Sequence, residues 1–161
     1  MKKKIAILGS TGSIGKCLID IIKKEKKNFE VVFLSADENY KELLKQAKFF
    51  KVENLVITNQ KSYQKIKKDE YSKKIRVFNN FDIMKKIFKK RIDYTMCSIS
   101  GIEGLKPTIE IIKYTNKIAI ANKESIICGW DLIEKRIKKY KTEFVPVDSE
   151  HFSIWYALKN I

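Results

Sequence analysis

The sequence has 161 residues, a length that suits one folded domain able to bury about two-thirds of its unfolded surface. Hydrophobic residues make up 44% and charged residues 33%, with six glycines and two prolines, which excludes a disordered or linker-dominated chain. The net charge is +15, and only three of the 34 basic residues are arginines. Three cysteines without CxxC spacing, and no signal peptide or membrane-spanning run, indicate a reduced, cytoplasmic protein without a membrane partner.

Short β-rich runs alternate with longer stretches of helical period along the chain. The predicted strands cover residues 4–8, 29–35, 54–58, 75–78, 93–98, 117–121 and 142–147. The predicted helices cover residues 14–27, 40–50, 62–68, 82–90, 105–114, 124–139 and 150–158. In the first helix, the face expected to be buried consists of Ile14, Leu18, Ile21 and Ile22. Several strands are apolar without alternation, so the pattern predicts a doubly wound α/β domain with a mostly parallel sheet of about seven strands.

Lysine-rich clusters recur at residues 23–27, 85–91 and 135–141, each near the carboxyl end of a predicted helix. Lysine at that end complements the helix dipole and suits a solvated face. A basic nucleic-acid-binding surface is the alternative, and it requires the clusters to converge with groups that read or stack on bases. The sequence has no helix-turn-helix, zinc-finger or aromatic-platform motif. We therefore expect no specific nucleic-acid partner.

The segment between the first strand and the first helix, residues 9–15, reads GSTGSIG. Glycines there let the backbone turn tightly and approach a pyrophosphate, while the helix N-terminus offers free N–H groups and a partial positive charge. The spacing is GxxGxxG rather than GxGxxG, and glycine at such a turn can also serve backbone geometry alone. In dinucleotide sites an acidic residue after the second strand binds the adenosine ribose, or a basic residue accepts a 2′-phosphate. This place holds Asp37, Glu38 and Asn39.

A second polar segment, Asn122-Lys123-Glu124, follows a predicted strand and opens a helix. Ligands of parallel sheets bind at these carboxyl ends. Asn122 could simply cap the helix, with Glu124 favoured in its first turn by the dipole. Lys123 is the stronger functional candidate, because a lysine beside a cofactor loop can contact substrate oxygens or the nicotinamide region.

A third polar segment, Asp148-Ser149-Glu150-His151, also joins a strand to a helix. Two carboxylates at i and i+2 point the same way in extended backbone, and they could hold a hard divalent cation such as Mg²⁺ or Mn²⁺. The alternative is a capping Asp148 followed by a favourable acid. The lone His151 lacks a cysteine or second histidine for a zinc site.

Together, GSTGSIG at 9–15, ANKES at 121–125 and PVDSEH at 146–151 closely resemble the 1-deoxy-D-xylulose 5-phosphate reductoisomerase family, over nearly the whole chain. The resemblance implies a Rossmann-like NAD(P)-binding domain. It also implies conversion of 1-deoxy-D-xylulose 5-phosphate, a phosphorylated sugar, to 2-C-methyl-D-erythritol 4-phosphate in non-mevalonate isoprenoid biosynthesis. NADPH, a divalent metal (Mg²⁺, Mn²⁺ or Co²⁺) and a homodimer are implied with it.

The resemblance also implies roles for individual residues. The residues implied to contact NADPH are Thr11, Gly12, Ser13, Ile14, Asn39, Asn122 and Glu124. Those implied to contact substrate are Lys123, Ser149 and Glu150. Asp148 and Glu150 are implied to ligate the metal, and they form the implied catalytic set with Lys123.

Two departures from the family qualify these implications. The family usually shows Gly–Lys/Arg–Asn after the second strand, where this chain has Asp37, Glu38 and Asn39. Two carboxylates would repel a 2′-phosphate, so either a lysine such as Lys41 compensates or the preference for NADP is weakened. Family members are also much longer.

We therefore expect residues 1–147 to form the dinucleotide-binding domain and residues 148–161 to begin the catalytic and metal-binding region, with its remainder absent from this chain. Such a chain is expected not to turn over substrate alone. Another NAD(P)-dependent oxidoreductase that shares the glycine segment is an alternative, although the NKES and DSEH segments argue against it.

Overall fold

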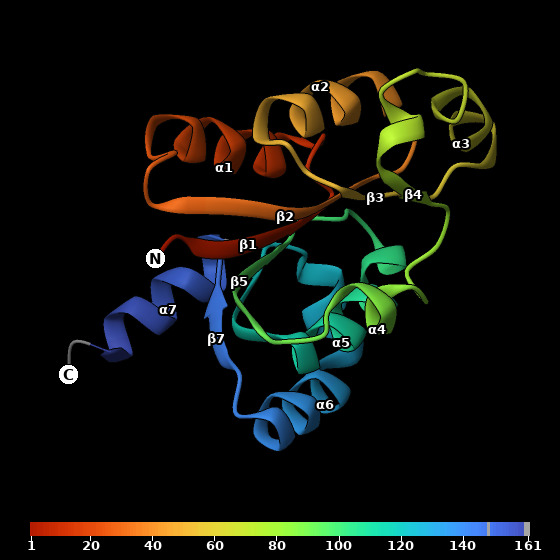
Figure 1. Ribbon diagram of the computed structural model, residues 1–161. Helices are drawn as coiled ribbons and strands as arrows, with labels where there is room; N and C mark the ends of the chain where they lie inside the picture. The colour runs from red at the N-terminus through yellow and green to blue at the C-terminus, as the bar shows by residue number, and fades with distance from the viewer. Residues whose placement is uncertain (148, 160–161) are drawn as a thin grey trace.

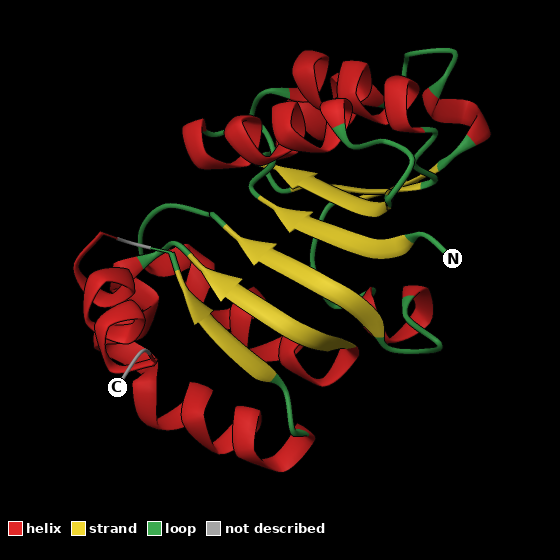
Figure 2. Ribbon diagram, turned by 90° about the vertical axis from the view of Figure 1, so that its left-hand side faces the viewer, coloured by secondary structure: helices red, strands yellow, loops and turns green. Residues whose placement is uncertain are grey.

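The computed structural model describes residues 1–147 and 149–159, with the side chains of Glu150, His151 and Lys159 outside the description. Within these residues, seven strands form one sheet: β1 (Lys3–Leu8), β2 (Phe29–Ala36), β3 (Asn54–Ile57), β4 (Arg76–Phe78), β5 (Ile92–Cys97), β6 (Thr115–Ile120) and β7 (Glu143–Pro146). Their order is β4-β3-β2-β1-β5-β6-β7, and every neighbouring pair is parallel. Figure 2 shows the strand arrows in the foreground pointing the same way.

The helices alternate with the strands along the chain. They are α1 (Ser13–Lys24), α2 (Tyr40–Phe50), α3 (Gln60–Ile66), α4 (Met84–Ile87), α5 (Leu105–Ile111), α6 (Lys123–Tyr140) and α7 (Ser149–Lys159), with 3₁₀ turns at Ser72–Lys74, Ile102–Gly104 and Ile112–Tyr114. Helices α1 to α3 cover one face of the sheet and α4 to α6 cover the other (Figure 1). The prediction of a doubly wound parallel fold is therefore confirmed.

The central strand β1 is buried on both sides. Ile5 and Ile7 pack into the core on one face of the sheet, whereas Ala6 and Leu8 pack into the core on the other. All four are at most 3% exposed. Successive side chains of a strand point to opposite faces, so a strand covered by helices on both sides needs apolar residues at every position. This explains the unbroken apolar run in the sequence.

The buried face of α1 differs from the predicted one. Ile14 and Ile21 are 41% and 51% exposed, so the prediction that they face the core is wrong. The buried positions are Gly15, Ile19 and Ile22, which share one stripe at i, i+4 and i+7. The stripe begins at Gly15 because only a residue without a side chain fits where the helix leaves the preceding turn.

The predicted helix over residues 82–90 is a single turn, Met84–Ile87. It ends because Phe88 leaves the helical conformation, with φ −92° and ψ 89°. Its ring is buried and packs edge-on against Phe33 of β2, with ring centroids 5.6 Å apart, and against Tyr114 at 5.6 Å. Long-range packing thus overrides the local helical pattern.

The three lysine clusters lie near the ends of α1, α4 and α6, as predicted. Helices that connect parallel strands run antiparallel to them, so these ends lie at the amino edge of the sheet, opposite the carboxyl ends of the strands. The clusters are nevertheless spread over both faces, because α1 lies on one side and α4 and α6 on the other (Figure 1). No helix of the described residues has the length and apolar character to cross a membrane.

Candidate functional site

The glycine loop is the turn between β1 and α1, residues 9–15. Gly9 has a φ of +80°, and a Cβ there would lie 2.6 Å from the Ser98 carbonyl oxygen. A Cβ on Gly15 would lie 2.3 Å from the Gly9 carbonyl oxygen. Both distances are shorter than side chains tolerate, so the fold itself requires these two glycines.

Gly12 differs from its two neighbours in the loop. Its φ of −75° and ψ of 174° suit any residue. A Cβ there would meet only the carbonyl oxygens of Gly9 at 3.5 Å and Ser98 at 3.9 Å, which are ordinary contacts. Gly12 is exposed, so the absence of a side chain leaves free space outside the loop rather than relieving a clash within it. A ligand could therefore come close to the protein backbone at this position.

The first turn of α1 carries unused hydrogen-bond donors. Gly12 is its N-cap, no described side chain accepts a hydrogen bond from this turn, and the turn holds no acidic residue. By contrast, the side chains of Asn39, Asn59 and Asn122 cap α2, α3 and α6. Uncapped N–H groups at the positive end of a helix dipole favour an anion.

The glycine loop is held in shape by three neighbouring elements. The Gly9 N–H donates to the Ser35 Oγ at 3.0 Å, and the Ser10 N–H donates to the Ser35 carbonyl at 2.8 Å. From α2, the buried Gln46 Nε2 donates to the Ser10 carbonyl at 3.0 Å. After β5, the Ser98 Oγ donates to the Gly9 carbonyl at 3.2 Å. The loop is therefore preorganised by β2, α2 and the end of β5.

The residues of the loop expected to contact a cofactor are placed where a ligand could reach them. Thr11 is half-buried, whereas Gly12, Ser13 and Ile14 are exposed. They follow one another from the turn into the first turn of α1, at the carboxyl edge of the sheet. This arrangement can bind a pyrophosphate through backbone N–H groups and place the side chains of Thr11, Ser13 and Ile14 beside it.

A polar row follows the carboxyl ends of β2 and β3. The Thr58 Oγ1 donates to Asp37 Oδ1 at 2.6 Å, and the Asn59 Nδ2 donates to Glu38 Oε1 at 3.4 Å. Asp37 and Glu38 are both exposed. The next residue, Asn39, caps α2 by accepting a hydrogen bond from the Glu42 N–H at 3.1 Å.

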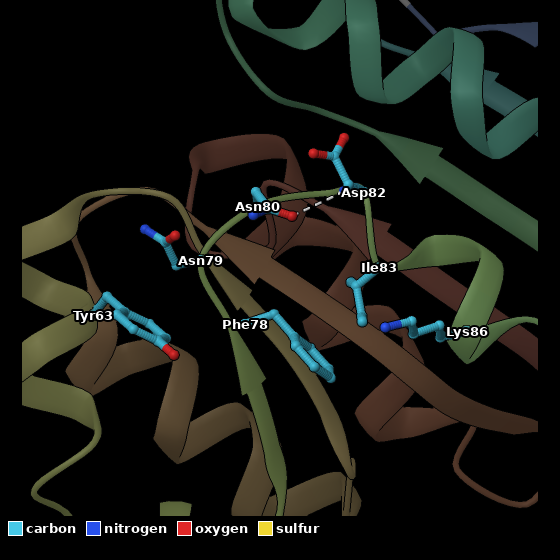
Figure 3. Close-up of a pocket in the computed structure, with 7 residues that line it drawn as sticks. All are labelled: Tyr63, Phe78, Asn79, Asn80, Asp82, Ile83 and Lys86. Atoms are coloured by element: carbon cyan, nitrogen blue, oxygen red, sulfur yellow. Dashed lines mark hydrogen bonds between the residues drawn. The ribbon is translucent and has the colours of Figure 1, made fainter.

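A pocket of about 350 Å³ lies at the carboxyl end of β4, beside α3 and α4 (Figure 3). Its walls include the rings of Tyr63 and Phe78, the amides of Asn79 and Asn80, and Lys86. The Asn79 side chain donates to Gln60 Oε1 at 2.8 Å, which ties the pocket to the start of α3. None of the predicted site residues lines it.

Asn122 is 4% exposed and its side chain is fully engaged. Its Nδ2 donates to the carbonyl oxygens of Ile99 and Gly101, and its Oδ1 accepts from the Ser125 N–H at 2.7 Å. The capping role considered for Asn122 is therefore present in the structure. Its contact with a cofactor stays a prediction, and the bonds observed give it a positioning role between β5 and α6.

The remaining predicted residues lie at the starts of α6 and α7. Lys123 and Glu124 are exposed in the first turn of α6, which follows β6 at the carboxyl edge. Ser149 is exposed at the start of α7. Asp148 and the side chain of Glu150 lie outside the described residues, so the structure does not test the predicted metal pair. The described residues contain no group of three or more His, Cys, Asp or Glu arranged to hold a metal ion.

Comparison with known proteins relates this chain to one family. Residues 5–129 match the family model described as 1-deoxy-D-xylulose 5-phosphate reductoisomerase. The reductoisomerase of Pelagibacter ubique (strain HTCC1062) is 59% identical over 160 residues, which cover 98% of this chain and 41% of that protein. The chain thus spans about 41% of the length of such relatives.

Solved structures of that family share the fold. The reductoisomerase from Zymomonas mobilis in complex with NADPH superposes with a TM-score of 0.84 at 30% identity, covering 94% of this chain and 40% of that one. A reductoisomerase in complex with NADPH, fosmidomycin and magnesium superposes with a TM-score of 0.83 at 26% identity, covering 92% and 37%. The family model, the close relative and the shared fold agree, and the chain belongs to the 1-deoxy-D-xylulose 5-phosphate reductoisomerase family.

Proposed function

We propose that this chain is the dinucleotide-binding part of a reductoisomerase that converts 1-deoxy-D-xylulose 5-phosphate to 2-C-methyl-D-erythritol 4-phosphate. The observation that carries the proposal is the first turn of α1. Its N–H groups are uncapped, and Gly12 leaves free space in front of them. Relatives of known structure hold NADPH. The reduced nicotinamide ring supplies a hydride when such a cofactor is bound.

In this proposal, the residues of the chain bind and orient the dinucleotide. The glycine loop binds the pyrophosphate through the N–H groups at the start of α1, and Thr11, Ser13 and Ile14 lie beside it. Asn122 holds the segment at Ile99–Gly101 in place, so that the edge between β5 and β6 keeps its shape.

The substrate side of the site is assigned to the starts of α6 and α7. Lys123 would orient and partly neutralise the substrate oxygens, and Ser149 would donate a hydrogen bond to them. Asp148 and Glu150 would hold a divalent metal such as Mg²⁺, Mn²⁺ or Co²⁺, which polarises a carbonyl group when bound. We assign residues 1–147 to cofactor binding and residues 148–161 to the start of the catalytic region.

Three further assignments belong to this proposal. A cytoplasmic location is supported by the three cysteines, all of which are free. A homodimer is expected for the full-length family. No specific nucleic-acid partner is expected, because the lysine clusters are spread over both faces of the sheet.

Two measurements on the chain test this function. Titration with NADPH or NADH, followed by tryptophan fluorescence, should show saturable binding of at least one dinucleotide. Incubation with 1-deoxy-D-xylulose 5-phosphate, NADPH and Mn²⁺ should show no NADPH oxidation, because Asp148 and Glu150 supply only two metal ligands. Absence of dinucleotide binding, or turnover by the chain alone, would contradict the proposal.

A hybrid protein tests the catalytic assignment. The 161 residues would replace the matching 41% of the Pelagibacter ubique relative, which is 59% identical over that region. The hybrid should oxidise NADPH in the presence of substrate and Mn²⁺. The hybrid variants Asp148→Asn and Glu150→Gln should lose that activity while keeping dinucleotide binding.

A further inference from the structure

The end of β2 lies directly against the glycine loop. The Ser35 Oγ and carbonyl both receive hydrogen bonds from the loop, at 3.0 Å from the Gly9 N–H and 2.8 Å from the Ser10 N–H. Asp37 follows two residues later, just beyond the last residue of β2. In doubly wound dinucleotide sites, this is the place where the adenosine ribose or its 2′-phosphate is recognised.

We propose that this site discriminates against the 2′-phosphate, so that NADH binds at least as tightly as NADPH. The inference rests on the proposed function, because it concerns which dinucleotide occupies the glycine loop. It names Asp37 and Glu38 as the residues that set the specificity.

The Asp37 carboxylate is suited to a ribose with free hydroxyl groups. One of its oxygens, Oδ1, accepts a hydrogen bond from the Thr58 hydroxyl at 2.6 Å, which fixes the carboxylate between β2 and β3. The side chain is exposed, so its other oxygen is open to accept from a ribose hydroxyl. A 2′-phosphate at the same position would place negative charge and hydrogen-bond acceptors beside the carboxylate. It has no proton with which to donate a hydrogen bond to the carboxylate.

Glu38 adds a second negative charge to the same end of the strand. Its Oε1 accepts a hydrogen bond from the Asn59 side chain at 3.4 Å, and its side chain is exposed. Both carboxylates would therefore repel a phosphate dianion placed beside Asp37.

No described lysine or arginine forms an ion pair with either carboxylate. Neither Asp37, Glu38 nor the neighbouring Lys41 takes part in an ion pair within the described part of the chain. Arginine is the residue that most often binds phosphate with two donors. Arg76 begins β4 at the amino edge, and Arg91 donates to the Tyr140 carbonyl at 2.6 Å, also at that edge.

The inference is tested by binding rather than by turnover. Tryptophan fluorescence and thermal shift would be used to titrate the chain separately with NADPH and NADH. We expect the Kd for NADH to be equal to or lower than that for NADPH. In the double variant Asp37→Asn and Glu38→Lys, the ratio of the two constants should move toward NADPH by about tenfold or more, which is about 1.4 kcal/mol.

The matched control is Glu30→Lys, an exposed acid at the opposite end of the same strand. It makes the same change of charge as Glu38→Lys and should leave the ratio unchanged. Tighter binding of NADPH than of NADH in the wild-type chain, or an unchanged ratio in the double variant, would overturn the inference while leaving the proposed function intact. If neither dinucleotide bound, the proposed function itself would fail.

Discussion

The side-chain amide of Asn122 donates a hydrogen bond to the Gly101 carbonyl oxygen at 2.7 Å. The two residues lie 21 positions apart and follow different strands, β6 and β5. The bond fixes the segment after β5 against the start of α6. Gly104 makes room for it, because a Cβ on Gly104 would lie 2.6 Å from the Asn122 Nδ2. Burial of this amide thus shapes the carboxyl edge of the sheet between two predicted site segments.

Replacing Asn122 with alanine should lower the free energy of unfolding by about 2–4 kcal/mol. The loss combines the N-cap of α6 with partly buried carbonyl groups left unpaired at Ile99 and Gly101. Asn39→Ala is the control, because Asn39 is exposed and only caps α2, so its loss should cost about 1 kcal/mol. Urea denaturation of both variants measures the difference, and equal losses would contradict the positioning role of Asn122.

Gly15 and Gly12 of the loop should respond differently to alanine. Gly15→Ala places a Cβ 2.3 Å from a backbone oxygen, and the resulting overpacking should cost about 1–3 kcal/mol of stability. Gly12→Ala meets no short contact and has ordinary dihedral angles, so stability should be unchanged or higher by about 0.4–1 kcal/mol. Thermal and urea unfolding would measure both, and a destabilised Gly12→Ala variant would contradict the structural distinction.

The three cysteines should differ in reactivity. Cys17 and Cys128 are exposed, whereas Cys97 is buried at the end of β5. Burial raises the pKa of the Cys97 thiol to about 12, so the reactive thiolate is scarce at neutral pH. At pH 8, a chromogenic disulfide reagent should react quickly with two thiols, and the third should react only on unfolding. Rapid reaction of all three in the folded protein would show that Cys97 is accessible.

The lysine surplus should produce only weak, salt-sensitive attraction to polyanions. The clusters lie at the ends of α1, α4 and α6, over both faces of the sheet, so they form a diffuse surface. Fluorescence anisotropy with DNA and RNA should show binding that fades uniformly as salt rises to physiological strength. Persistent binding that discriminates between sequences or structures would favour the nucleic-acid alternative.

Much of the fold could be predicted because its signals are local. Helix α2 begins at Tyr40 and ends at Phe50, as the periodicity predicts, because Asn39 caps its start and Lys51 adopts the left-handed conformation at its end. The short α4 could not be predicted in this way. Its end depends on Phe88 packing against Phe33 and Tyr114, which lie far away in the sequence.

The candidate site was predictable to a similar extent. The glycine loop and its position between β1 and α1 follow from the sequence, whereas the supports from Gln46 and Ser98 were not anticipated. One feature of the sequence could have pointed to Gln46. It is a polar residue on the same turn of α2 as Leu43 and Ala47, which belong to the buried face. The hydrogen bond between Thr58 and Asp37 depends on the pairing of β2 with β3, which the sequence alone does not specify.

The most direct test of this account is dinucleotide binding by the Gly12→Val variant. The dihedral angles at Gly12 suit a β-branched residue, so the fold should be retained, while the valine side chain would fill the space in front of the uncapped turn of α1. We predict that the variant unfolds at nearly the same temperature as the wild type and that its Kd for NADPH and for NADH rises about tenfold or more. Unchanged affinity in a folded Gly12→Val variant would contradict the assignment of the glycine loop as the cofactor site.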